Sequence, residues 1–504
     1  MKCQFVIDVD VDSATLDVEQ ASKLKFRWAR QGRENVKVAY FPAGTEYEHP
    51  NADFFVRNGQ ADPADQECID SVGAMTPEQR DALCRRGLDD IFEPTLRTSI
   101  GALIEDVRVR GDEAVCDALA KFDGIRLSPD QLRVTEEEIA TASIDPAVEN
   151  AIIDAISHLR AFNDQILERN SDWQIEIENG LTAGEKITPI SSVGLFVPSG
   201  KASYPSVAYQ LGVPAVVAGV PNITLIVPPI PGGNGEVDPA VLVVCRLLGI
   251  KNVFRVNGPA GIAALGFGTK TIPKVRKVMG PGSPAVTIAQ VEMQRHGLAT
   301  MMLLGPTESL VIADHTAHIG KLAADLLVEA EHGTDSSVVL VCTSEEMIEA
   351  VDAELALQLE DLPEVRATAA RASLGPNGGA VLVKNLTEAA EVANLYAPEH
   401  LQMAVDAQHE EQLLDLLVNA GEILIGQNTP FSAGNFVIGA PASLPTSGFA
   451  HVSSGITVDA FLKRTAVAKA NEPALRRMAQ TIIAMSDHEG FPAHGNAIRH
   501  RFNL

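Results

Sequence analysis

From residue 190 onward, short β-rich runs alternate with helical segments, and this alternation constrains the fold of the 504-residue chain more than any other feature. The runs at 193–197, 222–227 and 252–256 predict strands, and the apolar stretch 239–248 predicts a helix between the last two. Strands that alternate with helices form parallel sheets covered by helices. We therefore expect a first α/β unit in this part of the chain.

A second series of the same kind follows. The runs at 310–313, 337–341 and 380–383 predict strands, and an amphipathic helix precedes His332. A chain of 504 residues is too long for one hydrophobic core. The two series predict two Rossmann-like units, and the cleft between such units is the usual place for a ligand.

Composition narrows the range of partners. The chain has 66 acidic and 40 basic residues, a net charge of −26, which disfavours binding to nucleic acid or anionic membranes. The long apolar stretch 207–230 is interrupted by prolines, so we expect no membrane span. The six cysteines are scattered without a CxxC pair, which favours a reduced, cytoplasmic compartment.

The first chemically suggestive motif lies at the end of the predicted helix before residue 333. Leu322, Leu326 and Leu327 recur at helical spacing, and Glu329 and His332 follow, three residues apart. A carboxylate and an imidazole at this spacing can share a divalent ion, and zinc accepts oxygen and nitrogen ligands. Many helices carry a solvated Glu and His at the same spacing, so the pair alone does not distinguish a metal site from a surface.

The second motif is the pair Glu399–His400, which follows Pro398. Adjacent side chains do not share a helical face, so we expect the pair on a loop or at a helix start. Histidine is the usual base for removing an alcohol proton near neutral pH, and a carboxylate can activate water. The alternative is a Glu that begins a helix beside a surface His.

Taken together and in order, these motifs resemble the histidinol dehydrogenase family over residues 95–504. The motifs are Gly305-Pro-Thr-Glu-Ser309, Ala330-Glu-His332, Ala397-Pro-Glu-His-Leu401, and then Glu489 and His494, with supporting runs at 194–200, 263–268, 280–282 and 444–446. The resemblance implies a zinc- and NAD-dependent enzyme that oxidises an alcohol through a retained aldehyde to a carboxylate. It also implies a homodimer in which the C-terminal tail reaches the partner's site.

The resemblance assigns roles motif by motif. It implies zinc ligands at Glu329, His332, Asn435 and His494. His400 becomes the base in both oxidation steps, and Glu399 activates the water that attacks the aldehyde. Substrate contacts fall to Thr307, Glu489 and His400, and the cofactor-binding positions are Phe196, Ala260 and Ser283.

The metal ligands depart from the family pattern in a compensating way. Glu329 stands where the family usually has Gln, and Asn435 stands where it usually has Asp. The set still totals two His, one carboxylate and one amide, so the charge is preserved, which favours a working metal site.

Other departures concern substrate and cofactor. Ala442 replaces a His that usually precedes the Leu-Pro-Thr run, and Phe196, Ala260 and Ser283 replace a Tyr, a Gln and an Asn. These changes leave the substrate open between L-histidinol and another small polar alcohol, such as a sulfonated diol. NAD is the expected cofactor, and NADP is not excluded. A non-catalytic relative that has lost cofactor binding is the third alternative.

The predicted fold class is α/β, with two incomplete Rossmann-like domains of parallel strands and helical N- and C-terminal extensions. We predict an accessory segment over 1–75 and a larger domain over 76–195 and 307–456 that carries the zinc and catalytic motifs. A cofactor-side domain is predicted over 196–306, and a helical tail over 457–504 completes the site, in the partner subunit.

Overall fold

The computed structural model describes residues 93–199, 203–301 and 305–503, together with six short strands among the first 63 residues. These strands are β1 (Lys2–Gln4), β2 (Val9–Asp10), β3 (Lys25–Gln31), β4 (Glu34–Phe41), β5 (Glu46–Glu48) and β6 (Asp62–Pro63). The predicted accessory segment otherwise lies outside the described residues. Within the described ranges, no helix has both the length and the apolar character needed to cross a membrane.

The first α/β unit is built on a four-stranded parallel sheet in the order β11-β10-β9-β12. Its central strand β9 is buried at every position, which explains its continuous apolar run. The strands are β9 (Val193–Phe196), β10 (Ile223–Val227), β11 (Asn252–Arg255) and β12 (Lys277–Met279). The helices between and after them are α10 (Pro205–Val217), α11 (Pro239–Leu248), α12 (Gly258–Phe267) and α13 (Pro284–Gln294).

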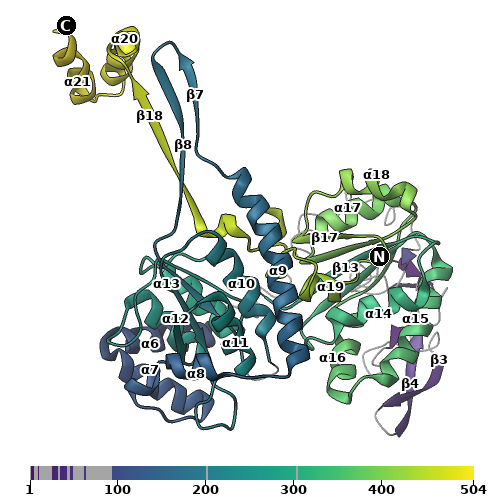
Figure 1. The fold of residues 1–504 in the computed structure, drawn as a ribbon. Coiled ribbons are helices and arrows are strands. Elements are labelled where there is room, and N and C mark those ends of the chain that lie inside the picture. Colours follow the sequence, from purple (N-terminus) through teal and green to yellow (C-terminus); the bar gives the residue numbers. More distant parts are fainter. Residues whose placement is uncertain are drawn as a thin grey trace.

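Helices from the preceding part of the chain cover this sheet unit (Figure 1). They are α6 (Pro94–Arg110), α7 (Asp112–Ala118), α8 (Glu136–Thr141) and α9 (Pro146–Arg169), with single turns η3 (Leu119–Asp123) and η4 (Pro129–Gln131). Ile104 of α6 and Leu159 of α9 belong to the cores of the four-stranded unit. This packing differs from the predicted grouping of 76–195 with 307–456, because the apolar faces of α6 and α9 are buried against α10, α12 and α13. The residues at which the predicted domains begin and end are not tested by this packing and remain a prediction.

The second α/β unit is a five-stranded parallel sheet in the order β15-β14-β13-β16-β17. The strands are β13 (Glu308–Ala313), β14 (Ser337–Cys342), β15 (Gly379–Leu382), β16 (His400–Ala404) and β17 (Glu422–Ile425). The helices are α14 (Ile319–Ala330), α15 (Glu345–Gln358), α16 (Glu364–Leu374), α17 (Leu386–Tyr396), α18 (Glu410–Leu416) and α19 (Phe431–Phe436). Single turns are η5 (Leu359–Asp361), η6 (Ala407–His409), η7 (Phe449–His451) and η8 (Val458–Phe461). The predicted α/β class with two parallel sheets is confirmed.

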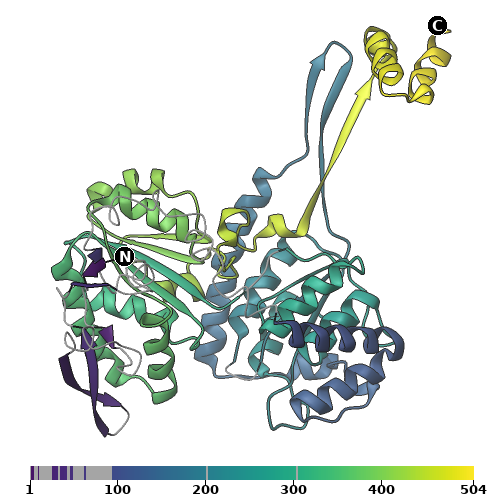
Figure 2. The same ribbon diagram turned by 180° about the vertical axis from the view of Figure 1, so that it is seen from behind.

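A long arm extends away from both units, as Figures 1 and 2 show from opposite sides. Its stem is an antiparallel ribbon of β7 (Trp173–Glu178), β8 (Leu181–Pro189) and β18 (Leu462–Ala470), and its tip is formed by α20 (Glu472–His488) and α21 (Pro492–Phe502). The prediction of a wholly helical tail was wrong at residues 462–470. That strand is exposed along almost its whole length, so it lacks the alternation of apolar and polar residues that marks a half-buried strand.

Asp314 ties together the loops that follow β13 and β16. Its carboxylate accepts hydrogen bonds from the backbone N–H of Thr316 at 2.8 Å and of Asp406 at 3.0 Å. Burial alone would raise the pKa of Asp314, but these hydrogen bonds outweigh it and lower the pKa below its usual value. The carboxylate form is therefore the one that stabilises the fold.

We expect Asp314→Asn to lower the free energy of unfolding by about 1–3 kcal/mol at neutral pH, because buried N–H groups lose a charged acceptor. The folded-state pKa is depressed, so the contribution is fully present above the ordinary value of about 4 and is lost as the pH falls through the folded value. Urea unfolding at pH 7 and near pH 2, below the depressed folded-state pKa of Asp314, measures both effects. The exposed Asp415→Asn serves as control, and equal stabilities of the Asp314 variant and the native chain at pH 7 would contradict the assignment.

Candidate active site

The predicted base, His400, and two further acidic residues lie at the amino ends of neighbouring strands of the five-stranded sheet. Glu308 begins β13, His400 begins β16 and Glu422 begins β17. His400 pairs in register with Ser309 on one side and with Glu422 on the other. The expectation that the Glu–His pair lies on a loop or at a helix start was wrong for His400, because the buried apolar run that follows it enters the sheet as β16.

His400 is held almost completely inside the protein, with 3% of its surface exposed. Its Nδ1 lies 2.6 Å from Oε1 of Glu422, its Nε2 lies 3.8 Å from Oε1 of Glu399, and its ring meets the edge of the Phe431 ring. Burial would lower the pKa of His400, but the carboxylates of Glu329, Glu399 and Glu422 outweigh burial and raise the pKa to about 10. The surroundings thus favour the protonated imidazole, the form that a base reaches after it has taken a proton.

Glu399 is fixed by the start of the neighbouring strand. Its Oε2 accepts a hydrogen bond from the backbone N–H of Glu308 at 3.1 Å, and the carboxylate of Glu308 accepts one from the N–H of Ser447 at 3.0 Å. Burial raises the pKa of Glu399 to about 8, although the nearby His400 opposes the rise. A buried acid beside a buried imidazole can exchange a proton near neutral pH, which is the behaviour of an acid–base pair.

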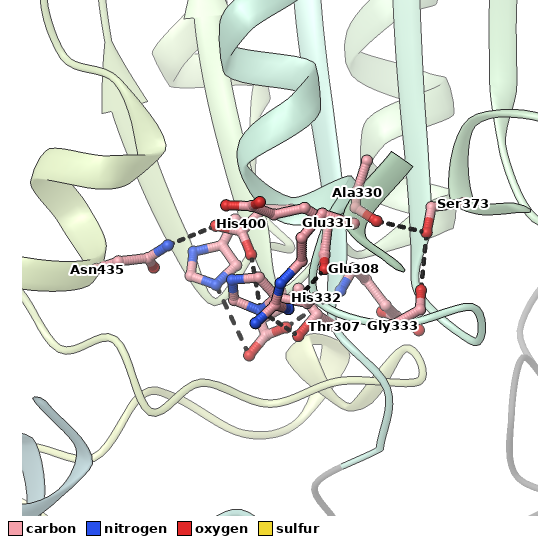
Figure 3. Close-up of polar contacts among 12 residues, drawn as sticks. Thr307, Glu308, Ala330, Glu331, His332, Gly333, Ser373, His400 and Asn435 are labelled. Carbon is pink, nitrogen blue, oxygen red and sulfur yellow. Dashed lines mark hydrogen bonds and ion pairs between the residues drawn. The ribbon is translucent and has the colours of Figure 1, made fainter. Parts of the chain in front are cut away.

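A second group of polar side chains gathers beside this pair, at the end of α14 (Figure 3). Glu329 is fully buried, and its Oε1 accepts a hydrogen bond from Nδ2 of Asn435 on α19 at 2.6 Å. Its Oε2 has no hydrogen-bond partner among the described residues and lies 3.6 Å from Nδ1 of His332. His332 in turn lies 3.3 Å from the hydroxyl of Thr307 and is about half exposed.

The turn that carries His332 is anchored from α16. The buried hydroxyl of Ser373 lies 3.0 Å from the carbonyl oxygens of both Ala330 and Gly333, on either side of His332 (Figure 3). Arg366 donates to the carbonyl of Glu331 at 3.0 Å. These contacts hold the end of α14 in one conformation, so the imidazole of His332 keeps its place beside Glu329.

The donor set of Glu329, His332 and Asn435 fits a zinc ion. Zinc is bound by imidazole nitrogen and carboxylate oxygen, and the orphaned Oε2 of Glu329 is a buried acceptor that a cation would satisfy. Within the described part of the chain, no group of three or more His, Cys, Asp or Glu side chains is arranged to hold a metal ion by itself. A closed ligand shell therefore requires the amide of Asn435 and one further group.

The structure does not bring the two predicted C-terminal site residues to this place within one chain. Glu489 directly follows the last residue of α20, and His494 lies on α21, where its ring centroid is 5.4 Å from that of Phe491. Both helices sit at the tip of the arm, far from the five-stranded sheet in both views (Figures 1 and 2).

The predicted cofactor-binding positions share the carboxyl edge of the four-stranded sheet. Phe196 ends β9, Ala260 lies in the first turn of α12, and Ser283 precedes the first residue of α13. Phe196 and Ala260 are buried, and only Ser283 exposes its side chain. A Cβ on Gly258 or Gly282 would come within 3.2 Å or 2.9 Å of the Phe196 ring, so the ring fills the space beside these glycines. Contacts to a ligand here would rest on the backbone N–H groups at the two helix starts.

Two acidic residues of the site were missed in the sequence. Glu308 and Glu422 each open a buried apolar strand, and a charged residue at the first position of such a run is a weak signal. The β7–β8 hairpin of the arm has a clearer signal in the sequence. Ile175 and Ile177 alternate with glutamates before the turn at Asn179-Gly180.

Comparison with known proteins gives a consistent result. The family model for histidinol dehydrogenase matches residues 90–502. A histidinol dehydrogenase homolog from Colwellia psychrerythraea is 37% identical over 438 residues, covering 86% of this chain and 96% of the relative. A histidinol dehydrogenase from Synechocystis is 38% identical and covers 85% of this chain and 98% of the relative. The crystal structure of histidinol dehydrogenase from Elizabethkingia anophelis superposes with a TM-score of 0.79 at 32% identity, covering 85% of this chain and 96% of that one.

Fold and relatives together define the class, an α/β oxidoreductase built on two parallel sheets. The chain belongs to the histidinol dehydrogenase family. The resemblance inferred from the motifs is thereby confirmed, and it extends over nearly all of the chain from residue 90 onward.

Proposed function

We propose that the protein is a zinc-dependent, NAD-linked dehydrogenase that oxidises a small polar primary alcohol through a retained aldehyde to the carboxylate. L-Histidinol, oxidised to L-histidine, is the first candidate substrate. The observation that carries the proposal is the buried His400, which lies between the carboxylates of Glu399 and Glu422 beside the group of Glu329, His332 and Asn435. The family membership of the chain supports the same reaction class.

In this proposal His400 removes the hydroxyl proton of the substrate through Nε2, the ring nitrogen on the side of Glu399. Glu399 then activates the water that attacks the aldehyde, and Thr307 contacts the substrate. Glu329, His332, Asn435 and His494 would hold a zinc ion, which would polarise the substrate oxygen. The burial of Glu399 and His400 excludes bulk water, which protects a reactive aldehyde between the two steps.

The remaining ligand, His494, and the substrate contact Glu489 come in this proposal from a partner subunit. The arm of each chain leaves the body, and apolar side chains along it are exposed, among them Ile175, Ile177 and Phe491. A homodimer in which each arm packs on the other body would bury these side chains and complete both sites. The cytoplasmic location stays a prediction.

A second candidate function is the oxidation of a different polar alcohol, such as a sulfonated diol. Ala442 stands where the family usually carries an imidazole, and its backbone N–H donates to Gln210 at 3.1 Å. Two similar relatives, from Colwellia psychrerythraea and Rhizobium meliloti, are named histidinol dehydrogenase homologs. The missing imidazole at position 442 favours a substrate without an imidazole ring.

The reaction is tested by following the reduction of NAD with zinc-loaded protein and L-histidinol. We expect two molecules of NAD reduced for each molecule of histidinol consumed, and no reduction after zinc is removed with a chelator. No rate with histidinol, but a rate with a sulfonated or amino alcohol, would establish the second candidate. No rate with any alcohol and no binding of NAD or NADP would leave the non-catalytic alternative.

A further inference from the structure

Glu422 is a carboxylate that no family motif of the chain includes, yet it makes the shortest contact of His400. The two residues are direct partners in the pairing of β16 with β17, and their Nδ1 and Oε1 atoms are 2.6 Å apart. Both side chains are only 4% exposed. Because register sets the pair, Glu422 is held against the imidazole by the sheet itself.

A carboxylate at this depth is unfavourable unless a partner compensates for its lost hydration. The other oxygen of Glu422, Oε2, has no hydrogen-bond partner among the described residues. The backbone leaves room for the group at Gly434, where a Cβ would come within 2.9 Å of Oε1 and 3.2 Å of Oε2. An apolar side chain could fill this space equally well. The carboxylate is therefore explained by its contact with the imidazole of His400.

The groups around the imidazole divide between its two nitrogens. Glu422 of β17 faces Nδ1 within hydrogen-bond distance, whereas Glu399 faces Nε2 at 3.8 Å. Phe431 of α19 covers the ring, and the charge of Glu329 acts from α14. Among the described residues, Glu422 alone is placed to fix which nitrogen carries the proton in the neutral ring.

We infer that Glu422 is a positioning residue for the base, and this inference rests on the proposed function. By accepting a hydrogen bond from Nδ1–H it holds His400 in the tautomer whose Nε2 lone pair faces the substrate. When the hydroxyl proton moves to Nε2, the imidazole becomes a cation, and the Glu422 carboxylate stabilises that charge without taking the proton itself. The proton count is therefore unchanged at Glu422 throughout the reaction.

Glu422→Gln tests this role through kinetics, because it keeps the shape but removes the charge. We expect kcat to fall about 10- to 100-fold, as for other groups that orient a functional histidine, with KM and zinc content close to the native values. Glu422→Asp should restore part of kcat, because it keeps the charge. Asp325→Asn is the matched control, since Asp325 is also a buried carboxylate that binds a β16 side chain, Gln402, at 2.7 Å.

The pH profile of kcat/KM separates positioning from a merely structural role. His400 accepts a proton only when neutral, so the rate rises with pH through its pKa. Glu422 is one of the carboxylates that raise this pKa, so its removal moves the acid limb to lower pH. A Glu422→Gln enzyme with native kcat, or with a reduced kcat and an unshifted limb, would overturn the inference.

Proton NMR of the native protein gives a test that does not depend on turnover. A histidine Nδ1–H bound to a buried carboxylate resonates far downfield of the amide region. We expect such a signal in the native protein and its loss in both Glu422→Gln and His400→Gln, but not in Asp325→Asn. If no alcohol were oxidised, the proposed function would fail. The downfield signal would still show whether His400 and Glu422 are hydrogen-bonded. A native spectrum without the signal, or its persistence in Glu422→Gln, would refute the pairing.

Discussion

His400→Ala is expected to lower the rate of alcohol oxidation by about 10²–10⁴-fold, the usual contribution of a positioned general base. Zinc should stay bound, because the predicted ligands Glu329, His332 and Asn435 contact one another independently of the imidazole. The cavity left by the ring lies against Phe431 and Glu422, so some loss of thermal stability is expected as well. Steady-state reduction of NAD together with metal analysis of the purified variant measures rate and zinc content.

His315→Ala is the matched control for that experiment. His315 is exposed and follows the carboxyl end of β13, whereas His400 lies at the amino edge of the same sheet. We expect the control to retain native activity. If His400→Ala also retained full activity, the assignment of the base would be wrong. If it lost zinc and activity together, His400 would belong to the metal site.

The second large effect concerns His332 and His494, whose replacement by alanine should release zinc and activity together. Zinc sites need their full ligand set, and loss of an imidazole removes one of four donors. Glu329 would then keep a buried oxygen without a partner. Metal analysis after dialysis, combined with the NAD assay, measures both quantities for each variant.

Mixing the two variants tests whether the site is shared. If His494 of the partner subunit completes each site, a mixed dimer of one His332→Ala chain and one His494→Ala chain contains one intact site and one doubly defective site. Random reassociation of equal amounts should then restore about one quarter of native activity, since half of the two-fold symmetric dimers are mixed. If each tail served its own chain, mixing would restore nothing.

The sequence predicted the buried parts of the fold well, because buried parallel strands such as β9 and β13 leave continuous apolar runs. The prediction failed for β18. Its residues are exposed almost throughout, so apolar and polar residues do not alternate along it. Within the arm, β18 is therefore the strand that local pattern could not reveal, since it has no core to pack against.

The site was predictable only in part for a related reason. The motifs indicated Glu329, His332, Glu399 and His400, and the structure brings these together with Asn435 across more than 100 residues of chain. Glu422 was missed because its partner is 22 residues away in the sequence. Its role depends on strand register, which no short motif records.

That register has an evolutionary consequence. The connection between His400 and Glu422 includes α18, and it can lengthen or shorten without separating the two residues, because the ladder and not the connection sets their distance. A slip of β17 by one residue would instead turn Glu422 to the opposite face of the sheet. His400 and Glu422 form a single rung of the β16–β17 ladder, so selection acts on the two residues as one heritable unit, and insertions in the surface helix between them can accumulate.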